Sequence, residues 1–261
     1  MLASYHGYIL DLDGTIYKGN EAIAESVHFV HALAERRIPH VFLTNNSSRT
    51  PAEIAEKLKR MDVPASAGQV YTSSMAMAAY VREHWGVQRP PVRAYVIGSR
   101  GLVHALEEIG VVFTDEDPDA VIVGIDRSFT YEKLVKAQRA LLNGAALLAT
   151  NADRTIPSEN GYMPGNGSIV AAIATAAHVT PTFIGKPERW IVEQSLSLLG
   201  TPKAETLLVG DNYDTDILAG INAGVPTLHV DTGVTPAAEL TKKDHQPTHS
   251  LTNLDVKLLG L

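Results

Sequence analysis

The sequence of 261 residues contains no cysteine. This absence excludes a disulfide framework, thiolate metal ligands and a cysteine nucleophile, and it fits a reducing compartment, so we expect a cytoplasmic protein. Aromatic residues are also scarce, at 6%. The sequence has no apolar run near the roughly 18 residues that a membrane helix needs, and it does not begin with a basic region and a long apolar run. We therefore expect neither a membrane span nor a secretory signal.

Basic side chains are outnumbered by acidic ones. Lys and Arg total 22 and Asp and Glu total 29, which gives a net charge of −7. A chain of this sign has no general attraction to nucleic acid or to anionic membranes, so we expect neither as a partner. The 45% hydrophobic and 20% charged residues are ordinary for a globular protein. The length allows one large domain or two small ones.

Short apolar runs alternate with helix-like stretches along the chain. Helix start signals stand at Thr50-Pro51, Thr130 and Pro187. Strands that alternate with helices predict a parallel α/β sheet with right-handed crossovers. Seven apolar runs predict buried strands, at Tyr8–Leu12, His40–Thr44, Ala94–Gly98, Ala120–Gly124, Ala146–Thr150, Thr206–Val209 and Thr227–Val230.

Two proline-containing stretches, 88–91 and 179–181, flank a segment that has βαβ signals of its own. We therefore predict an inserted, smaller α/β domain at residues 89–179. The remaining residues, 1–88 and 180–261, are predicted to form a discontinuous core. This core is expected to be a three-layer, Rossmann-like α/β domain with a parallel sheet.

The pair Asp11 and Asp13 stands at the end of the first predicted strand. Residues two apart on an extended strand point the same way, and ligands bind at the carboxyl ends of strands in open α/β sheets. Two adjacent carboxylates repel unless a cation lies between them or one is protonated. The pattern therefore favours a metal site or a nucleophile beside a general acid. A polar turn closed by Gly14 is the alternative.

Three further polar segments adjoin predicted strands or helices. Thr44 and Asn45 precede a capped helix, where backbone N–H groups suit a phosphate or simply a cap cluster. Pro187 holds Lys186 extended, as a compact cation for a phosphoryl group or as an exposed loop residue. The acidic turn 211–216 carries three carboxylates, which suit Mg²⁺ although such residues also cap helices.

In this order, the paired Asp, Thr-Asn, Lys and acidic-turn motifs make the sequence resemble the haloacid dehalogenase (HAD) superfamily of aspartate-nucleophile phosphatases. The resemblance covers nearly the whole chain. It is nearest to the NagD-like, p-nitrophenylphosphatase-type branch, which carries a large α/β (type IIA) cap between the Thr-Asn and Lys motifs. Residues 123–127 and 164–168 are also similar to that branch. The resemblance implies that the predicted insert is this cap and that it sets substrate specificity.

The resemblance also implies a role for each motif residue. Asp11 is expected to be the nucleophile that forms a phosphoaspartyl intermediate. Asp13 is expected to protonate the leaving alcohol and then to activate water. The resemblance assigns phosphate binding to Thr44, Asn45, Lys186, Asn212 and Thr215, and Mg²⁺ binding to Asp11, the Asp13 backbone carbonyl and Asp211, with Asp216 in support.

We therefore expect a phosphoric monoester hydrolase that requires Mg²⁺ and acts on small phosphate monoesters such as sugar phosphates or nucleotides, with p-nitrophenyl phosphate as an artificial substrate. Asp13 favours phosphate over halide chemistry, because expelling a halide needs no acid on the leaving group. Two alternatives stay open. A phospho-accepting signalling domain is disfavoured by the chain length and by Asp13. A catalytically silent phosphate-binding protein of the same fold is the other.

Two weaker features lie in the predicted insert. Asn151, Asp153 and Arg154 follow a strand and are candidates for contact with the polar tail of a substrate. The segment 164–168 precedes a helix and is either an anion cradle or a tight turn. From the family resemblance alone, we expect a homo-oligomer formed through the cap.

Overall fold

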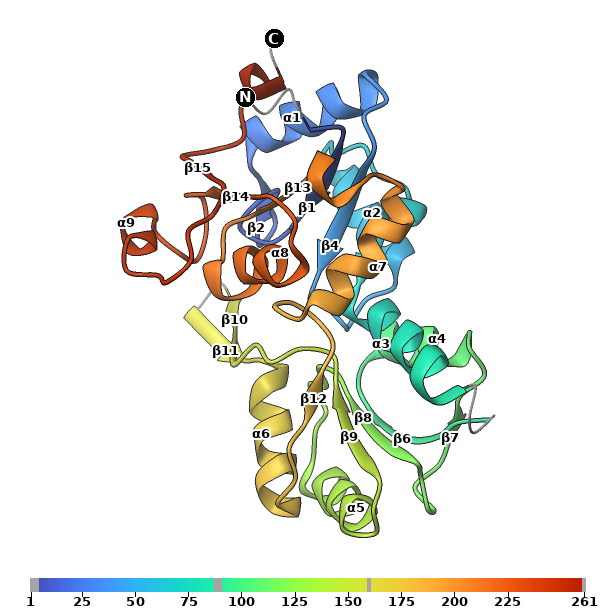
Figure 1. The fold of residues 1–261 in the computed structure, drawn as a ribbon. Coiled ribbons are helices and arrows are strands. Elements are labelled where there is room, and N and C mark those ends of the chain that lie inside the picture. Colours follow the sequence, from blue (N-terminus) through green and yellow to red (C-terminus); the bar gives the residue numbers. More distant parts are fainter. Residues whose placement is uncertain (1–4, 87–90, 159–160, 260–261) are drawn as a thin grey trace. The chain divides into compact units, whose positions relative to one another are not determined.

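The computed structural model describes residues 5–86, 91–158 and 161–259, and the chain divides into two compact units. The first unit comprises Met1–Thr44, Pro51–Tyr71 and Lys186–Leu261, and the second comprises Asn45–Thr50 and Thr72–Gly185 (Figure 1). The second unit therefore begins before the predicted insert and ends after it. The predicted junction at 88/89 itself lies in 87–90, outside the described residues.

A six-stranded sheet forms the centre of the first unit, in the order β15-β14-β13-β1-β4-β5. The pairs β15–β14, β14–β13, β13–β1 and β1–β4 are all parallel. The strands span Gly7–Leu10 (β1), His40–Thr44 (β4), Val70–Thr72 (β5), Thr206–Gly210 (β13), Thr227–Val230 (β14) and His249–Leu251 (β15).

Successive strand residues point to opposite sides of a sheet, and in this sheet helices cover both sides. Tyr8 and Leu10 of β1 share one buried cluster with Phe29 of α1 (Ala24–Glu35) and Leu58 of α2 (Pro51–Arg60). Helix α7 (Arg189–Leu199) contacts β1, β4 and α8 (Leu218–Ala223). The result is the predicted three-layer core. Smaller elements of this unit are β2 (Tyr17–Lys18), β3 (Glu21–Ala22), η2 (Ala67–Gln69), η4 (Lys203–Glu205), η5 (Tyr213–Ile217), α9 (Ala237–Leu240) and η6 (Val256–Leu259).

The second unit contains a five-stranded parallel sheet in the order β12-β9-β8-β6-β7. Helices α5 and α6 pack against it around Val121, Val123 and Ile173, and α3 contacts α4. The contact between α3 and α4 explains why residues 72–86 belong to this unit. Its elements are α3 (Ser73–Val81), η3 (Arg82–Gly86), β6 (Arg93–Ile97), α4 (Arg100–Glu107), β7 (Val112–Phe113), β8 (Ala120–Val123), α5 (Tyr131–Leu142), β9 (Ala146–Ala149), β10 (Thr155–Ser158), β11 (Gly161–Pro164), α6 (Asn166–Ala177) and β12 (Thr182–Phe183).

All seven predicted strands are present, and the structure adds short strands that the sequence analysis did not identify, including β5, β12 and β15. Thr130 caps α5 as predicted, with its hydroxyl accepting from the Lys133 amide. Helix α7 begins at Arg189, two residues after the predicted start at Pro187. None of the helices within the described residues is long and apolar enough to cross a membrane.

Candidate active site

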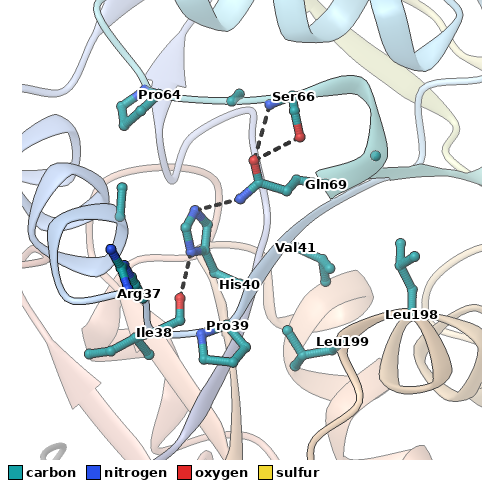
Figure 2. A pocket seen from close by; sticks show the side chains of 13 residues that line it. Arg37, Ile38, Pro39, His40, Val41, Pro64, Ser66, Gln69, Leu198 and Leu199 are labelled. Atoms are coloured by element: carbon teal, nitrogen blue, oxygen red, sulfur yellow. Dashed lines mark hydrogen bonds between the residues drawn. The ribbon is translucent and has the colours of Figure 1, made fainter.

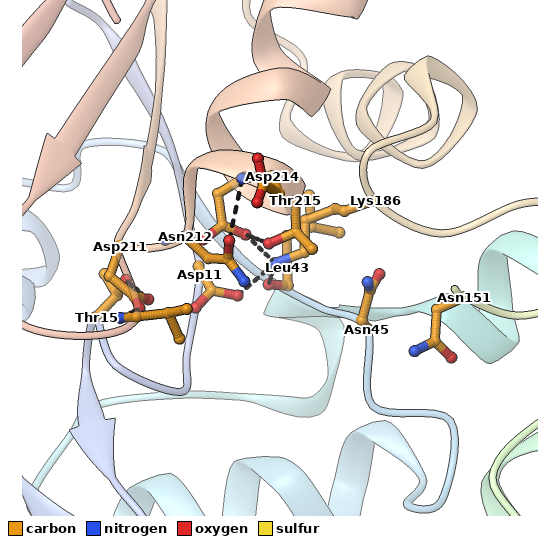
Figure 3. A network of polar contacts seen from close by, with 12 residues as sticks. Asp11, Thr15, Leu43, Asn45, Asn151, Lys186, Asp211, Asn212, Asp214 and Thr215 are labelled. Atoms are coloured by element: carbon orange, nitrogen blue, oxygen red, sulfur yellow. Dashed lines mark hydrogen bonds and ion pairs between the residues drawn. The ribbon is translucent and has the colours of Figure 1, made fainter. Parts of the chain in front are cut away.

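Two neighbouring parallel strands of the first unit place two carboxylates side by side. β1 ends at Leu10, which pairs in register with Val209 of β13. The next residue, Asp11, continues this parallel pairing, because its amide donates to the Val209 carbonyl at 2.9 Å. Asp11 and Asp211 each follow these strands directly. The predicted gathering of acidic motifs at the carboxyl ends of the sheet is therefore present in the structure (Figure 3).

The carboxylates of Asp11, Asp211 and Asp216 offer oxygen atoms that all lie within 4.8 Å of one another. These residues are only 8%, 1% and 1% exposed. Asp216 belongs to η5, which follows β13, and its Oδ2 accepts from the Asn212 amide at 3.0 Å. Three carboxylates from one strand end and one strand-to-helix turn thus share a buried space.

Lys186 supplies the positive charge of this cluster. Its side chain is 3% exposed, and the ammonium donates to the Asp11 carboxylate, to Asp216 Oδ1 at 2.7 Å and to the Leu43 carbonyl at 3.4 Å. Burial by itself lowers the pKa of Lys186, but the charges of Asp11 and Asp216 outweigh that effect and raise it. Lys186 is therefore a charged residue inside the site and not the exposed loop lysine of the alternative interpretation.

One lysine does not neutralise three carboxylates. Burial, followed by the charge of Asp216, raises the pKa of Asp11 well above its usual range. The same causes raise the pKa of Asp211 to about 6. A divalent cation would remove this repulsion, and carboxylate oxygens are the ligands that Mg²⁺ prefers. The donor set therefore fits a hard divalent ion.

Two loops, one after β1 and one after β14, hold Asp211 in place. The Thr15 hydroxyl donates to Asp211 Oδ1 at 3.1 Å, and the Val234 amide donates to Oδ2 at 2.7 Å. Gly14 has a φ of +92°, and a Cβ at this position would collide with the Asp211 carboxylate. The sequence assigns no role to Thr15 or Val234, because each acts through a hydrogen bond to Asp211, which is distant from both along the chain.

Asp13 has different surroundings from Asp11. The strand ends at Leu10, and the chain then turns, with the Ile16 amide donating to the Leu12 carbonyl at 2.8 Å. Asp13 therefore lies beyond the strand, and the strand alternation predicted from the sequence does not make its side chain point the same way as that of Asp11. Its side chain is exposed, and Oδ2 accepts from the Tyr17 hydroxyl at 2.9 Å.

The other residues of the acidic turn are held by local bonds. Asn212 Oδ1 accepts from the Asp214 amide at 3.0 Å, and the Thr215 hydroxyl donates to Asp216 Oδ1 at 3.2 Å. Asp214 is exposed and pairs with Lys243 at 2.7 Å. The turn thus directs Asp216 into the cluster, whereas Asp214 pairs at the surface.

The predicted pair Thr44 and Asn45 spans the boundary between the two units. Thr44 is the last residue of β4 and is buried beside Leu43, whose carbonyl accepts from Lys186. Asn45 opens the short segment assigned to the second unit, where its Nδ2 donates to Asp153 Oδ2 at 3.2 Å.

A separate pocket of about 480 Å³ lies at the amino end of β4 (Figure 2). His40 begins that strand, and its Nδ1 lies 2.9 Å from the Ile38 carbonyl and its Nε2 lies 3.0 Å from Gln69 Nε2. Burial lowers the pKa of His40, so a neutral ring that donates from Nδ1 and accepts at Nε2 satisfies both contacts. The pocket is at the opposite end of the strand from Thr44 and is not the acidic site.

Comparisons with known proteins find similarity along nearly the whole chain. Residues 8–112 match the family model of haloacid dehalogenase-like hydrolases, and residues 183–256 match a HAD-hydrolase-like model. The chain is 49% identical over 253 residues to the 5'-nucleotidase YutF of Bacillus subtilis, covering 97% of each chain. It is 44% identical over 258 residues to an acid sugar phosphatase of Staphylococcus epidermidis, covering 98% of each.

Solved structures show the same similarity. A double mutant of a thermostable NPPase from Geobacillus stearothermophilus is 50% identical, with a TM-score of 0.90 and 97% of each chain covered. NagD from Escherichia coli is 33% identical, with a TM-score of 0.88, covering 96% of this chain and 97% of NagD. The similarity therefore extends over both units and includes the NagD-like branch that the motifs indicated.

Proposed function

The chain belongs to the haloacid dehalogenase-like hydrolases and is a phosphoric monoester hydrolase of that family, and from this premise we propose that it hydrolyses small phosphate monoesters through a phosphoaspartyl intermediate on Asp11, with Mg²⁺. The observation that carries the proposal is the contact of Lys186 with both Asp11 and Asp216 inside the buried acidic cluster. Phosphoryl transfer needs positioning and charge neutralisation above all.

Asp11 is the proposed nucleophile. Its carboxylate follows β1 and is held by Lys186, so one oxygen has a fixed direction. Lys186 then neutralises charge on the transferred phosphoryl group, and its positive charge favours the ionised form of Asp11, opposing the effects of burial and of Asp216. Attack of the carboxylate on phosphorus forms the acyl phosphate and expels the alkoxide, and water later releases inorganic phosphate.

Asp13 is the proposed acid and base. It donates a proton to the leaving alkoxide and then accepts one from the attacking water. Its exposed carboxylate, bonded to the Tyr17 hydroxyl, has access to solvent for this exchange.

Mg²⁺ is the proposed metal. The carboxylates of Asp11 and Asp211 and the backbone carbonyl of Asp13 would hold it, with Asp216 in support through its contacts with Lys186 and Asn212. When bound, the ion supplies positive charge to the phosphoryl oxygens and removes the repulsion among the carboxylates. Thr15 and Val234 keep the Asp211 oxygens in place for this role.

Phosphoryl oxygens are proposed to bind Thr44, Asn45, Lys186, Asn212 and Thr215. We further propose that the second unit is the cap that selects the substrate. The relatives named as a 5'-nucleotidase, an acid sugar phosphatase and an NPPase support a nucleotide, a sugar phosphate or p-nitrophenyl phosphate as substrate. Association of two copies through the second unit is a further proposal, which light scattering of the purified protein tests.

The test is release of phosphate from p-nitrophenyl phosphate and from a panel of sugar phosphates and nucleotides, each with Mg²⁺ and with EDTA. We expect turnover that needs Mg²⁺ and is lost in Asp11→Asn. Asp214→Asn is the matched control, because Asp214 lies in the acidic turn but pairs with Lys243 at the surface. Full activity in Asp11→Asn would refute the proposal. Stable phosphorylation without turnover would support the signalling-domain alternative instead.

A further inference from the structure

A chain of buried polar side chains lies in the second unit, after β9. Asn166 Nδ2 donates to the Asn151 carbonyl at 2.9 Å and lies 3.3 Å from the Thr150 hydroxyl. Thr150 in turn donates to Asn151 Oδ1 at 2.9 Å, and Asn151 Nδ2 donates to Asp153 Oδ2 at 2.6 Å. Asn166 Oδ1 is the one buried side-chain nitrogen or oxygen atom in the described part of the chain that lacks a hydrogen-bond partner. Burying polar groups is costly unless they are hydrogen-bonded, so the bonds along this chain fix its side chains relative to one another.

The start of α6 forms hydrogen bonds with the backbone of Asp153 and Arg154. The Gly165 amide donates to the Arg154 carbonyl and the Gly167 amide to the Asp153 carbonyl, each at 2.8 Å. A Cβ on either glycine would collide with the backbone of residues 152–154. The Ser168 hydroxyl donates to the Arg154 carbonyl, also at 2.8 Å. The glycine motif 164–168 therefore directs these donors to the carbonyl groups of Asp153 and Arg154.

The far end of this polar chain is Asn45. Its Nδ2 lies 3.2 Å from Asp153 Oδ2 and 3.4 Å from Oδ1, and its backbone carbonyl accepts from the Ser73 hydroxyl at 2.8 Å. Main chain and side chain of Asn45 are therefore both held within the second unit. Figure 3 shows the side chains of Asn45 and Asn151 near each other, and both donate to Asp153.

We propose that Asp153 is a positioning residue that sets the direction of the Asn45 side-chain amide, an inference that rests on the proposed role of Asn45 in phosphoryl binding. An amide nitrogen carries two N–H donors in one plane. A carboxylate that binds one of them fixes the direction of the other and decides which way round the amide lies. Asp153 thereby orients an N–H donor for the phosphoryl group, and Asn151, Thr150 and Asn166 hold Asp153.

Direct contact of Asp153 with the phosphoryl group is the less favourable assignment. A carboxylate repels an anion. Asp153 Oδ2 already accepts from Asn151 and Asn45, and Oδ1 lies at hydrogen-bond distance from Asn45. The carboxylate therefore acts on the reaction through Asn45 and not by touching substrate.

A double-mutant cycle tests this inference in the full-length protein, with Asn45→Ala, Asp153→Ala and the double variant. The readouts are kcat and KM for p-nitrophenyl phosphate with Mg²⁺, and inhibition by inorganic phosphate. We expect each single variant to lose about tenfold in kcat/KM and to weaken phosphate inhibition, which is the size of one hydrogen bond to an ionic group. The double variant should be no worse than Asn45→Ala, because residues that act as one unit are not additive.

Two further variants separate positioning from a general loss of structure. Asp153→Asn keeps one oxygen for Asn45 but faces Asn151 with a second donor, so it should fall between the wild type and Asp153→Ala. Asp115→Ala removes an exposed carboxylate of the second unit that pairs with Lys136, and it should leave both readouts unchanged. Thermal unfolding shows whether each variant folds.

The outcomes are distinct. Positioning is supported if the two single variants lose kcat/KM by similar factors and the double variant loses no more than Asn45→Ala. Losses that multiply in the double variant, or a loss in Asn45→Ala but none in Asp153→Ala, overturn the inference and leave the proposed function intact. No effect of Asn45→Ala on phosphate inhibition overturns the proposed role of Asn45, and the inference falls with it.

Discussion

Replacing Asp211 by asparagine should stabilise the metal-free protein at neutral pH. Asp211 is 1% exposed, and burial together with the charge of Asp216 raises its pKa from 3.8 to about 6. Keeping it ionised in the folded protein therefore costs about 3 kcal/mol relative to the unfolded chain. Asparagine has the same shape and carries no charge, so it removes this cost.

The gain in the free energy of unfolding of Asp211→Asn is reduced because the substitution alters two hydrogen bonds. Thr15 and Val234 both donate to the Asp211 carboxylate. The Val234 amide can still donate to the asparagine oxygen, and the Thr15 hydroxyl can rotate to accept from the asparagine nitrogen. Weaker bonds at these two positions cost about 1 kcal/mol. We expect a net gain of about 2 kcal/mol, which raises Tm by about 4–8 °C in a chain of this size.

The stability gained by Asp211→Asn should depend on pH in a definite direction. A carboxyl group whose pKa is raised in the folded state stabilises the protein below its unfolded pKa, and that stability is lost as pH rises through the folded value. The difference between Asp211→Asn and the wild type should therefore be small near pH 4 and should grow as pH rises through about 6.

The assay is thermal unfolding in EDTA across this pH range, repeated with Mg²⁺. Mg²⁺ should raise the Tm of the wild type, since an ion that binds only the folded state stabilises it, and should raise the Tm of Asp211→Asn much less. A variant that is less stable than the wild type in EDTA at neutral pH would refute the electrostatic reasoning. An undiminished response to Mg²⁺ would refute the place of Asp211 in the metal site.

Further predictions concern the same cluster. Lys186→Met should abolish phosphatase activity and lower Tm in EDTA at neutral pH, because Asp11 and Asp216 lose their buried counter-charge; removing one partner of a buried pair costs about 3–5 kcal/mol. Gly14→Ala should lower both Tm and the response to Mg²⁺, because the added methyl group collides with Asp211 and the backbone has a φ of +92°. EDTA should abolish phosphate release and excess Mg²⁺ should restore it, whereas recovery without added metal would contradict the metal requirement.

Much of the fold could be predicted from the sequence, because buried parallel strands are short apolar runs and each of the seven predicted ones is present. The edge strand β15 (His249–Leu251) was not identified because it is only three residues long and two of them are polar. The early start of the second unit depends on packing of α3 against α4, which no local pattern reports.

In the site, too, some features could be predicted from the sequence and others depend on the tertiary fold. Asp11, Asp211 and Asp216 come together because the carboxyl ends of the parallel strands β1 and β13 share one edge, and Lys186 reaches them from the segment before α7; each could be identified from its motif. The hydrogen bond from Asn45 to Asp153 joins residues 108 positions apart. This contact depends on the tertiary fold, so from the sequence Asp153 could be named only as a candidate for contact with the substrate.

The most direct test of the central claim is mass spectrometry of the protein quenched in acid during turnover of p-nitrophenyl phosphate with Mg²⁺. The account predicts a fraction of the wild-type protein heavier by one phosphoryl group, carried on the peptide that contains Asp11 and absent from Asp11→Asn. Phosphate release by a wild-type protein whose phosphoryl group is found on another residue, or Asp11→Asn turning over at the wild-type rate, would contradict it.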